Sequence, residues 1–299
     1  MAVLNYVTTF LPHLVEKYGH LSCSDDLYHS NPGIEVINTK DIRIPSIKVG
    51  GYKDHNRGVL GFNTGSYSND WITKSLDHDR DIEFAVDPMD VDETAQVVSI
   101  SNIQANFERT QAIPEQDCYT FSKIYTEAKR VGANINNTVL TKENILDMLD
   151  ADMEAFAEAG VPLERCILYV TPTVNRTLKN AEGIQRYLEA NGGANIDRRV
   201  HSVDDINKIK EVPSDRLKTI YNFTDGCIPD AAAKQINYIL IDPECQVSRM
   251  KYSYVNVFTP GHDSRTADNY LYQNRKFNGT FAIDALLKEG CRINAEAEA

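Results

Sequence analysis

The sequence lacks the features by which several large classes of protein are recognised. No stretch of its 299 residues approaches the ~20 consecutive apolar residues that a bilayer-spanning helix needs. Residues 1–20 carry no basic start and no small-residue cleavage site, which is unlike a secretory signal. We therefore expect a protein that is made in the cytoplasm and has no membrane partner.

Clustered cysteines and clustered basic charge are also missing. The six cysteines are spread along the chain without a C-x-x-C pair, and none of the seven histidines joins them at a zinc-binding spacing. In a cytoplasmic protein such cysteines are most simply small buried side chains. Lys and Arg total 31 against 43 Asp and Glu, a net charge of -12. Because phosphate binding needs clustered basic residues, this balance argues against nucleic-acid binding over most of the surface.

No catalytic motif is present. The sequence has no G-x-S-x-G, no Walker loop and no G-x-G-x-x-G. The nearest approach to a catalytic set is Cys166 with His201 and Asp204, which have suitable side chains but no motif around them. We predict no catalytic residue, no metal and no cofactor, and keep a soluble enzyme as the alternative from a different class.

An extended pair of strands is the first feature that the sequence does contain. Within residues 34–86, Ile42 and Ile44 alternate with polar residues, and "YSNDWITKSL" and "DIEFAV" continue the period of two. Gly50 and Gly51 supply turn chemistry between the strands. We interpret 34–86 as two long strands joined by a glycine-rich tip. Its apolar residues are too few for a core, so we expect the hairpin to lie on another surface.

The apolar period becomes helical from Asp92. This first helix is predicted to end before Pro114, because proline disfavours helix in the residue before it. Pro114 then suits the first position of a second helix, which reaches Val131 and is capped by Gly132.

The second helix has a charged start and one apolar face. Glu115 and Asp117 lie in its first turn, where the helix dipole favours acids, and Lys123 lies on the polar face. The spacing predicts a buried stripe of Cys118, Phe121, Ile124, Tyr125 and Ala128.

The acidic stretch "DRDIEFAVDPMDVDET" lies at the entry of the first helix. Asp90, Asp92 and Glu93 fall near a calcium-loop spacing, but the further oxygen ligand and the glycine of such a loop are absent. Either Asp90 or Asp92 suits the N-cap, with Glu93 in the first turn and Arg80 and Arg109 available as partners. We therefore predict a helix entry and not a metal or catalytic site. The motif comprises Asp87, Asp90, Asp92 and Glu93.

One more long helix and several strands complete the chain. Thr141 is predicted to cap a helix that ends at Gly160, with Ile145, Leu149 and Phe156 facing inward. "CILYV" is typical of a buried strand, and "NRTLKN" and "GIQRYLEA" of helix, whereas "SCSDDLYHSNPG" near the start has no regular pattern. The strands "INKIKEV", "INYILI", "YSYVNVF" and "NYLYQNRKFNGTFAI" follow. Because strands and helices stand in separate blocks, the predicted class is α+β.

Several of these segments resemble one family. "DRDIEFAVDPMDVDET" followed by "ANFERTQAIPEQDCYTFSKIYTEA" resembles a signature of the major capsid proteins of tailed bacteriophages. "LERCILYVTPTVNRTLKN", "INYILIDPECQVSRMKYSYVNVFTPG" and "ADNYLYQNRKFNGTFAI" resemble later parts of that family, so the likeness covers most of residues 34–295. "IRIPSIKVGGYKDHNRG" resembles its extended loop, with a tip at Gly50, Gly51, Tyr52, Asp54, Arg57 and Gly58.

The resemblance implies an α+β shell fold that is shared with encapsulins and herpesvirus capsid floors. It implies an N-terminal arm, an extended β-hairpin loop that lies over a neighbouring subunit, a peripheral domain with a long spine helix, and an axial domain. The corresponding ranges are an arm at 1–33, the loop at 34–86, the peripheral domain at 87–139 with its spine helix at 114–131, the axial domain at 140–253 and a closing peripheral part at 254–299.

The resemblance also implies a function. The expected protein is structural and assembles through hexamers and pentamers into an icosahedral shell around double-stranded DNA, in a virion assembled in the host cytoplasm. An encapsulin-like compartment is the alternative within the same fold. Expected partners are further copies of the chain, a separate scaffolding protein, a portal and decoration proteins, while the acidic chain should touch DNA weakly or not at all. Side chains suited to a covalent cross-link between subunits are present at Lys48, Lys53, Asn269, Asn274 and Asn278, without clear evidence for the bond.

Overall fold

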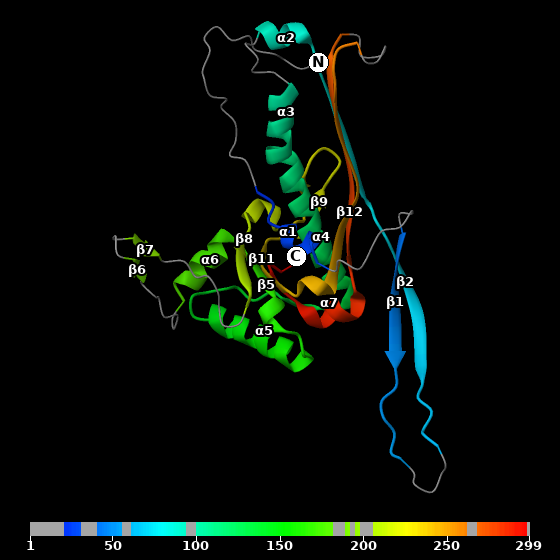
Figure 1. The fold of residues 1–299 in the computed structure, drawn as a ribbon. Coiled ribbons are helices and arrows are strands. Elements are labelled where there is room, and N and C mark those ends of the chain that lie inside the picture. Colours follow the sequence, from blue (N-terminus) through cyan, green and yellow to red (C-terminus); the bar gives the residue numbers. More distant parts are fainter. Residues whose placement is uncertain are drawn as a thin grey trace.

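The computed structural model describes residues 21–30, 41–55, 61–93, 100–181, 189–191, 195–197, 206–261 and 268–297. Figure 1 shows a body built around a sheet, a long arm of helices and strands that rises from it, and a two-stranded hairpin that projects the other way. Within these ranges, no helix is both long enough and apolar enough to cross a membrane.

The body is a mixed sheet with helices on both faces. Three central strands are antiparallel to one another, and an edge strand pairs in parallel on each side. The strand order is β4 (Asn134–Asn136), β14 (Cys291–Ala295), β11 (Ile236–Ile241), β5 (Ile167–Val170) and β8 (Lys208–Glu211). One face is covered by α4 (Ile113–Val131) and α7 (Asp284–Gly290), the other by α5 (Ile145–Ala159) and α6 (Pro172–Lys179).

Successive residues of β5 face opposite layers of the core. Ile167 and Tyr169 pack in the layer with α4, and Leu168 and Val170 pack in the layer with α5. A strand that is covered on both faces has no polar side, which explains why "CILYV" is a continuous apolar run. The predicted buried strand is therefore confirmed. The inward-facing positions predicted for α5 are confirmed as well, at Ile145, Leu149 and Phe156.

The helical arm is one continuous rod, and the predicted break before Pro114 is wrong. The helix α3 (Ile100–Phe107) passes through a π-helical turn, Glu108–Ala112, into α4. In this turn the Ile113 N–H donates to the carbonyl five residues back instead of four. Proline lacks an N–H, and its ring clashes with the carbonyl of the preceding turn in a regular helix. The wider π turn accommodates Pro114 without ending the rod.

The second helix otherwise follows its prediction. Gly132 ends α4 in a left-handed conformation with a φ of 71°, and Gly160 ends α5 in the same way with a φ of 75°. The predicted stripe is buried at all five positions, Cys118, Phe121, Ile124, Tyr125 and Ala128.

A second sheet of three long antiparallel strands lies beside the rod. Its central strand packs against α3 and α4. The strand order is β12 (Gln246–Phe258), β13 (Tyr270–Ala282) and β3 (His78–Val86). The place of β3 corrects part of the predicted hairpin, because residues 78–86 pair with β13 and not with the strands that precede them.

The projecting hairpin consists of β1 (Asp41–Val49) and β2 (Tyr67–Ser75). Their register runs from Asp41 opposite Ser75 to Val49 opposite Tyr67. Among the described strands these two pair only with each other. The sequence therefore predicted both strands and the tip correctly, but placed the end of the hairpin too late.

Shorter elements complete the fold. Residues 25–28 form a one-turn helix, where no regular structure was predicted, and its Leu27 is fully buried. The closing helix α7 and strand β14 were not predicted, and most of "GIQRYLEA" lies outside the described residues. The remaining bounds are α1 (Asp25–Tyr28), α2 (Pro88–Glu93), β6 (Glu189–Asn191), β7 (Asn195–Asp197), β9 (Tyr221–Asn222) and β10 (Ile228–Pro229).

Candidate functional site

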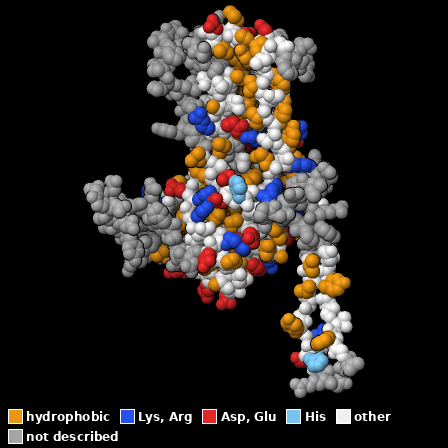
Figure 2. Space-filling view, viewed as in Figure 1, with side chains coloured by type: hydrophobic (Ala, Val, Ile, Leu, Met, Phe, Trp, Pro, Cys, Tyr) orange, Lys and Arg blue, Asp and Glu red, His pale blue; other side chains and the backbone are white. Residues whose placement is uncertain are grey.

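The hairpin presents an apolar face to solvent. Residues directly opposite each other in an antiparallel pair point to the same side, so Val49 and Tyr67 share a face, and Ile47 lies two residues away on it. Ile47, Val49 and Tyr67 are 68%, 77% and 83% exposed. Figure 2 shows hydrophobic side chains along this projecting hairpin. A two-stranded ribbon has no layer behind it, so nothing within the hairpin covers this face.

The tip of the hairpin is held by hydrogen bonds to backbone carbonyl groups. The Gly50 N–H donates to the Ser66 carbonyl at 2.8 Å, and the Asn63 amide donates to the Asp54 carbonyl at 2.8 Å. Beyond them the rings of Tyr52 and Phe62 are almost completely exposed. Of the six predicted tip residues, Gly50, Gly51, Tyr52 and Asp54 lie in the described tip, and Arg57 and Gly58 lie outside the described residues.

The root of the hairpin is held to α4 by ion pairs. Lys74, near the end of β2, lies 3.5 Å from Glu127, and Lys123 donates to Asp77 at 2.6 Å. Lys123 therefore lies on the polar face of α4, as predicted, but binds the hairpin root. Between these contacts Leu76 packs on β13, where a Cβ on Gly279 would lie 2.3 Å from its side chain. Only glycine allows this close approach.

His78, the first residue of β3, is buried at the root of the hairpin. Its ring stacks on Tyr119 at 4.0 Å and lies 3.6 Å from Glu115, which also binds Arg80 at 2.6 Å. Burial, followed by the nearby positive charge of Arg80, lowers the pKa of His78 to about 4. Burial alone would raise the pKa of Asp77, but hydrogen bonds from Lys123 and Tyr119 outweigh it and hold that pKa below its usual range. The imidazole is therefore neutral near pH 7 while the carboxylate beside it is charged.

A cavity of about 430 Å³ opens at this root. Three aromatic rings enclose its inner wall, since Phe223 meets His78 edge-on at 5.2 Å and lies 6.1 Å from Tyr119. Its charged side chains are engaged within the chain, so the cavity offers aromatic packing but no nucleophile with an activating base. The lining comprises Asp77, His78, Asp79, Arg80, Tyr119, Ser122, Lys123, Thr126, Thr219, Ile220, Tyr221 and Phe223.

Asp117 has a structural role that its sequence position did not reveal. Its carboxylate is fully buried and accepts hydrogen bonds from the Cys23 N–H, the Ser24 N–H and the Ser24 hydroxyl. The Arg216 guanidinium lies 2.8 Å from it on the other side. The predicted role, a favourable charge in the first turn, is a small part of this arrangement. Asp117 joins the segment of residues 21–30, the rod and the body.

The acidic motif does begin a helix, but its cap differs from the one predicted. The Asp87 carboxylate accepts from the Met89 N–H at 2.8 Å, so Asp87 caps α2, not Asp90 or Asp92. Arg80 binds Glu115 instead of the motif. The side chain of Glu93 lies outside the described residues. Among the residues that are described, no group of three His, Cys, Asp or Glu side chains is arranged to hold a metal ion.

Of the remaining catalytic candidates, Cys166 alone lies in the part of the chain that the structure describes. His201 and Asp204 lie outside the described residues. The Cys166 thiol donates to the Pro162 carbonyl at 3.5 Å, and burial, followed by the charge of Asp242, raises the pKa of this thiol to about 12. Such a thiol carries almost no thiolate at neutral pH.

Two of the five cross-link candidates are buried. Asn274 donates to Glu108 at 2.5 Å and to the hydroxyl of Tyr272, and Asn278 donates to the hydroxyl of Tyr28 at 3.0 Å. These amides hold the long sheet against the rod and α1, so they are not placed to react with another subunit.

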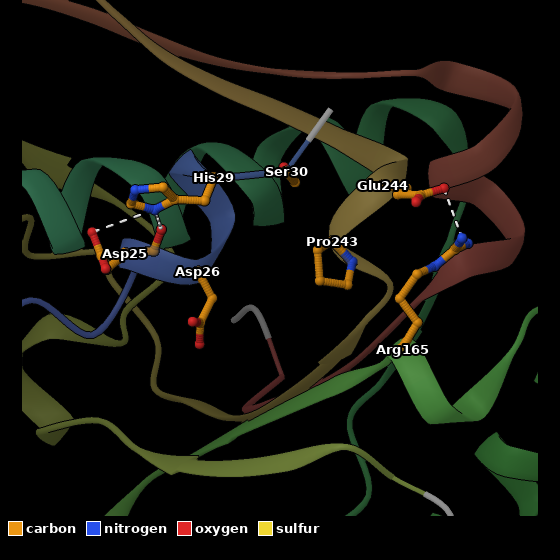
Figure 3. Close-up of a pocket in the computed structure, with 7 residues that line it drawn as sticks. All are labelled: Asp25, Asp26, His29, Ser30, Arg165, Pro243 and Glu244. Atoms are coloured by element: carbon orange, nitrogen blue, oxygen red, sulfur yellow. Dashed lines mark hydrogen bonds and ion pairs between the residues drawn. The ribbon is translucent and has the colours of Figure 1, made fainter. Parts of the chain in front are cut away.

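A second, polar hollow lies between α1 and the short 3-10 turn Pro243–Cys245 that precedes β12. It measures about 520 Å³, and Figure 3 shows Asp25, Asp26 and His29 on one side facing Arg165 and Glu244 on the other. Arg165 and Glu244 lie 2.7 Å apart, and Lys210 lies 2.7 Å from Asp26. Most charged side chains of this hollow therefore form ion pairs, and these pairs connect the elements that carry them.

The chain is similar to solved structures of bacteriophage particles. No known family model matches the sequence, and no curated protein matches it. A chain of "Asymmetric unit of bacteriophage PhiM1 mature capsid" is 14% identical with a TM-score of 0.71, covering 99% of this chain and 93% of that one. A chain of "Mycobacterium phage Che8" is 12% identical with a TM-score of 0.66, covering 98% of both.

A third phage capsid structure shows a similar likeness. A chain of "Capsid structure of the Cyanophage P-SCSP1u" is 11% identical with a TM-score of 0.65, covering 98% of this chain and 93% of that one. Likeness at these identities establishes the fold. The predicted α+β fold class is therefore confirmed, and the chain shares its fold with chains of these phage capsid structures.

Proposed function

We propose that this chain is a major capsid protein of a tailed bacteriophage. It assembles through hexamers and pentamers into an icosahedral shell that encloses double-stranded DNA, and it is a structural protein of the virion, not an enzyme. The observation that carries the proposal is the fold, which matches a chain of a phage mature capsid over 99% of this chain with a TM-score of 0.71.

The shape of the subunit supports assembly through different surfaces on neighbouring copies. The hairpin β1–β2 extends away from the body and leaves Ile47, Val49 and Tyr67 uncovered. A surface that meets a different surface on the next copy makes a heterologous contact, and such contacts generate rings when the rotation closes. The exposed tip, including Tyr52, is proposed to contact the neighbouring subunit.

The domain roles follow from the same proposal. Residues 41–75 act as the extended loop, and α4 acts as the spine helix of the peripheral domain together with the long sheet. The axial domain corresponds to the body around α5 and α6, within the predicted range 140–253, and the closing part spans 254–299. The arm at 1–33 reaches the body at residues 21–30, where Asp117 holds it.

The proposed partners are further copies of the chain, a separate scaffolding protein, a portal and decoration proteins. The net charge of -12 disfavours a tight grip on phosphate, so we propose that packaged DNA touches the shell weakly. A wall that releases few counterions on contact leaves the packaged DNA free to slide.

Electron microscopy and size-exclusion chromatography of the purified chain test the proposal. We expect capsomers or closed shells of megadalton mass. A small fixed oligomer that never forms shells, including when coexpressed with the neighbouring genes of its source, would overturn the proposal and favour a soluble enzyme. Shells that copurify with a protein cargo and no DNA would favour an encapsulin-like compartment.

A further inference from the structure

The two edge strands of the long sheet differ in charge. β3 forms one edge and carries Asp79, Arg80, Asp81 and Glu83. β12 forms the other edge, and its residues 252–258, "YSYVNVF", contain no charged residue, no proline and no glycine. Charged side chains discourage an edge strand from pairing with another chain, whereas short uncharged segments of high β propensity pair readily. The β3 edge is therefore protected by charge, and the β12 edge is not.

The beginning of the β12 edge is covered within the chain. α1 packs against β12, and the Arg249 guanidinium donates to the Tyr28 carbonyl of α1 at 2.7 Å. A β-bulge then lies between Met250 and Tyr252. Beyond the bulge, no strand in the described part of the chain pairs with the outer edge of β12. The open part of the edge is therefore residues 252–258.

Three residues of this open part direct their backbone groups away from the sheet. In an antiparallel pair, residues bonded to the partner strand alternate with residues whose N–H and C=O point away from it. The Val257 N–H donates to the Asn256 side chain at 2.9 Å, and the register is unbroken over residues 252–258. Val257, Val255 and Ser253 therefore point outward. The side chains of Val255 and Val257 are 43% and 39% exposed.

The same alternation follows from the other end of the sheet. Just beyond β13, the Ile283 N–H donates to the Cys245 carbonyl at 3.0 Å, so the odd-numbered residues of β13 bond to β12. The residues opposite the three outward positions of β12 are even-numbered: Lys276, Asn274 and Tyr272. Both ends of the sheet thus give the same set of outward backbone groups.

The open segment is complementary to a second copy of itself. In an antiparallel pair with Val255 opposite its own copy, Ser253 lies opposite Val257, so all three outward residues are paired. The same register places Tyr252 opposite Phe258, and cross-strand aromatic pairs stabilise a sheet. Because the segment carries no charge, its meeting with a copy brings no like charges together.

We propose, as an extension of the capsid function above, that β12 of one subunit pairs with β12 of a second copy across a two-fold axis at Val255, and that this contact joins neighbouring capsomers. Heterologous contacts through the hairpin close a ring, but rings need another contact to join one another. An isologous contact, which uses the same surface on both copies, meets this need. The long sheets of the two subunits become one continuous sheet.

The contact is short, so single subunits should pair weakly through it. Rings that present several copies of β12 at once gain avidity, because each contact that forms holds the next pair of strands close together. Weak single contacts of this kind suit a shell, since the capsomers form first and are then joined.

Cysteine cross-linking tests the pairing and its register. The Cα atoms of Val255 and its copy would lie about 5.5 Å apart, within the range that a disulfide bridges. Val257 and its copy would lie about 14 Å apart, so Val257→Cys is the matched control. Each variant and the parent protein are treated with oxidised glutathione, alkylated and digested without reductant, and linked peptides are identified by mass. We expect a homodimer link for Val255→Cys, none for Val257→Cys alone, and a link when Val257→Cys is mixed with Ser253→Cys.

Charge reversal tests the role in assembly. Val255→Glu and Val255→Lys change a partly exposed side chain and should leave the subunit folded. Either variant alone places like charges opposite each other across the axis, so each should form capsomers but lose closed particles in electron micrographs. Coexpression of the two variants should restore closed particles in part, because Glu then faces Lys. A change that merely damaged the subunit would not be rescued in this way.

Three results would overturn the proposal. They are the absence of a Val255→Cys homodimer from both particles and concentrated subunits, a link from Val255→Cys to Thr73→Cys of β2 in mixed subunits, and closed particles of Val255→Glu as abundant as those of the parent. The second result would assign the β12 edge to the hairpin of a neighbour. A parent protein that forms no shells would count against the proposed function alone, since cross-linking of concentrated subunits still decides whether β12 pairs with its copy.

Discussion

The Asp117 carboxylate and the Arg216 guanidinium lie 2.8 Å apart with side-chain exposures of 0% and 5%. The two residues come from α4 and from the short 3-10 turn Ser214–Arg216, and they enclose the backbone of Cys23 and Ser24. Two opposite charges are stable at this depth because each one satisfies the other and because the backbone N–H groups fill the remaining sites on the carboxylate.

Loss of the Asp117 carboxylate should be among the most damaging single changes in the chain. Asp117→Ala leaves Arg216 as an uncompensated buried charge, and removing one partner of a buried pair costs ~3–5 kcal/mol. Denaturant unfolding of the isolated chain measures this cost. Glu154→Ala on the exposed side of α5 is the matched control and should change the free energy of unfolding little. Equal small effects from both variants would show that the buried pair does not hold the subunit together.

The buried stripe of α4 supports a second prediction. The Phe121 ring is fully buried and meets Tyr169 edge-on at 5.0 Å. Phe121→Ala should cost ~3–5 kcal/mol, because it loses the transfer energy of the ring and leaves a cavity. Lys123 is not a neutral comparison, since it binds Asp77 at 2.6 Å. Thr126→Ala on the exposed side of the same helix is the better control. A Phe121→Ala protein as stable as Thr126→Ala would mean that the stripe is not core.

The parts of the fold that the sequence predicted are those in which local pattern and burial agree. The stripe of α4, with Phe121 at its centre, has helical spacing, and "CILYV" has the continuous apolar run of a strand covered on both faces. The helix was predicted to end before Pro114 because proline usually ends a helix locally. In the structure a π-helical turn accommodates this proline, and no local sequence pattern indicates such a turn. The place of β3 depends on pairing with β13, which lies nearly two hundred residues later in the chain.

The surroundings of Asp117 and the root of the hairpin were the least predictable parts of the candidate site. Asp117 showed only the signal of an acid in a first turn, while its partners come from residues 22–24 and from Arg216. His78 had no motif around it, and its environment is assembled from β3, α4 and the turn that carries Phe223. Long-range contacts of this kind leave no short-range pattern in a single sequence.

Lowering the pH should destabilise the hairpin root at pH values above those at which most carboxylates become protonated. The folded-state pKa of His78 is about 4, and its unfolded value is 6.5. Between these values the unfolded chain binds a proton that the folded chain does not, so stability falls as the pH falls from 6.5 towards 4. The full difference corresponds to about 3 kcal/mol. Asp77 affects stability over a lower pH range. Because its folded-state pKa is depressed, the stability that its charged form provides is lost only as the pH falls below about 4.

The variant His78→Gln isolates this effect. Its free energy of unfolding should change less than that of the parent protein between pH 6.5 and 4, as measured by denaturant titration at a series of pH values. Asp79 and Arg80 keep their charges in both proteins, so they cancel in the comparison. Parallel pH profiles for the two proteins would show that His78 does not carry the dependence.

The acidic motif should not need a metal ion. Asp87 caps α2 through the Met89 N–H, and the described residues hold no metal cluster. Treatment with a chelator should therefore leave the thermal midpoint and any assembled particles unchanged. Particles that dissociate on chelation and form again when calcium is added would assign the motif to metal binding. Asp87→Ala should instead cost ~1 kcal/mol through loss of the cap, with or without chelator.

The exposed face of the hairpin should matter for assembly and not for the fold of the subunit. Ile47 and Val49 are mostly exposed in the single chain, so replacing both with Ser removes little buried area and should leave the unfolding midpoint of the isolated subunit almost unchanged. In a shell the same side chains would lie against a neighbouring copy, and each would lose ~1.5–3 kcal/mol of burial on substitution. Repeated at every interface, this loss should abolish closed particles in electron micrographs. The variant Lys48→Ser, between them on the opposite face, should still assemble. If the double variant forms shells as readily as Lys48→Ser, the apolar face of the hairpin does not contact another subunit.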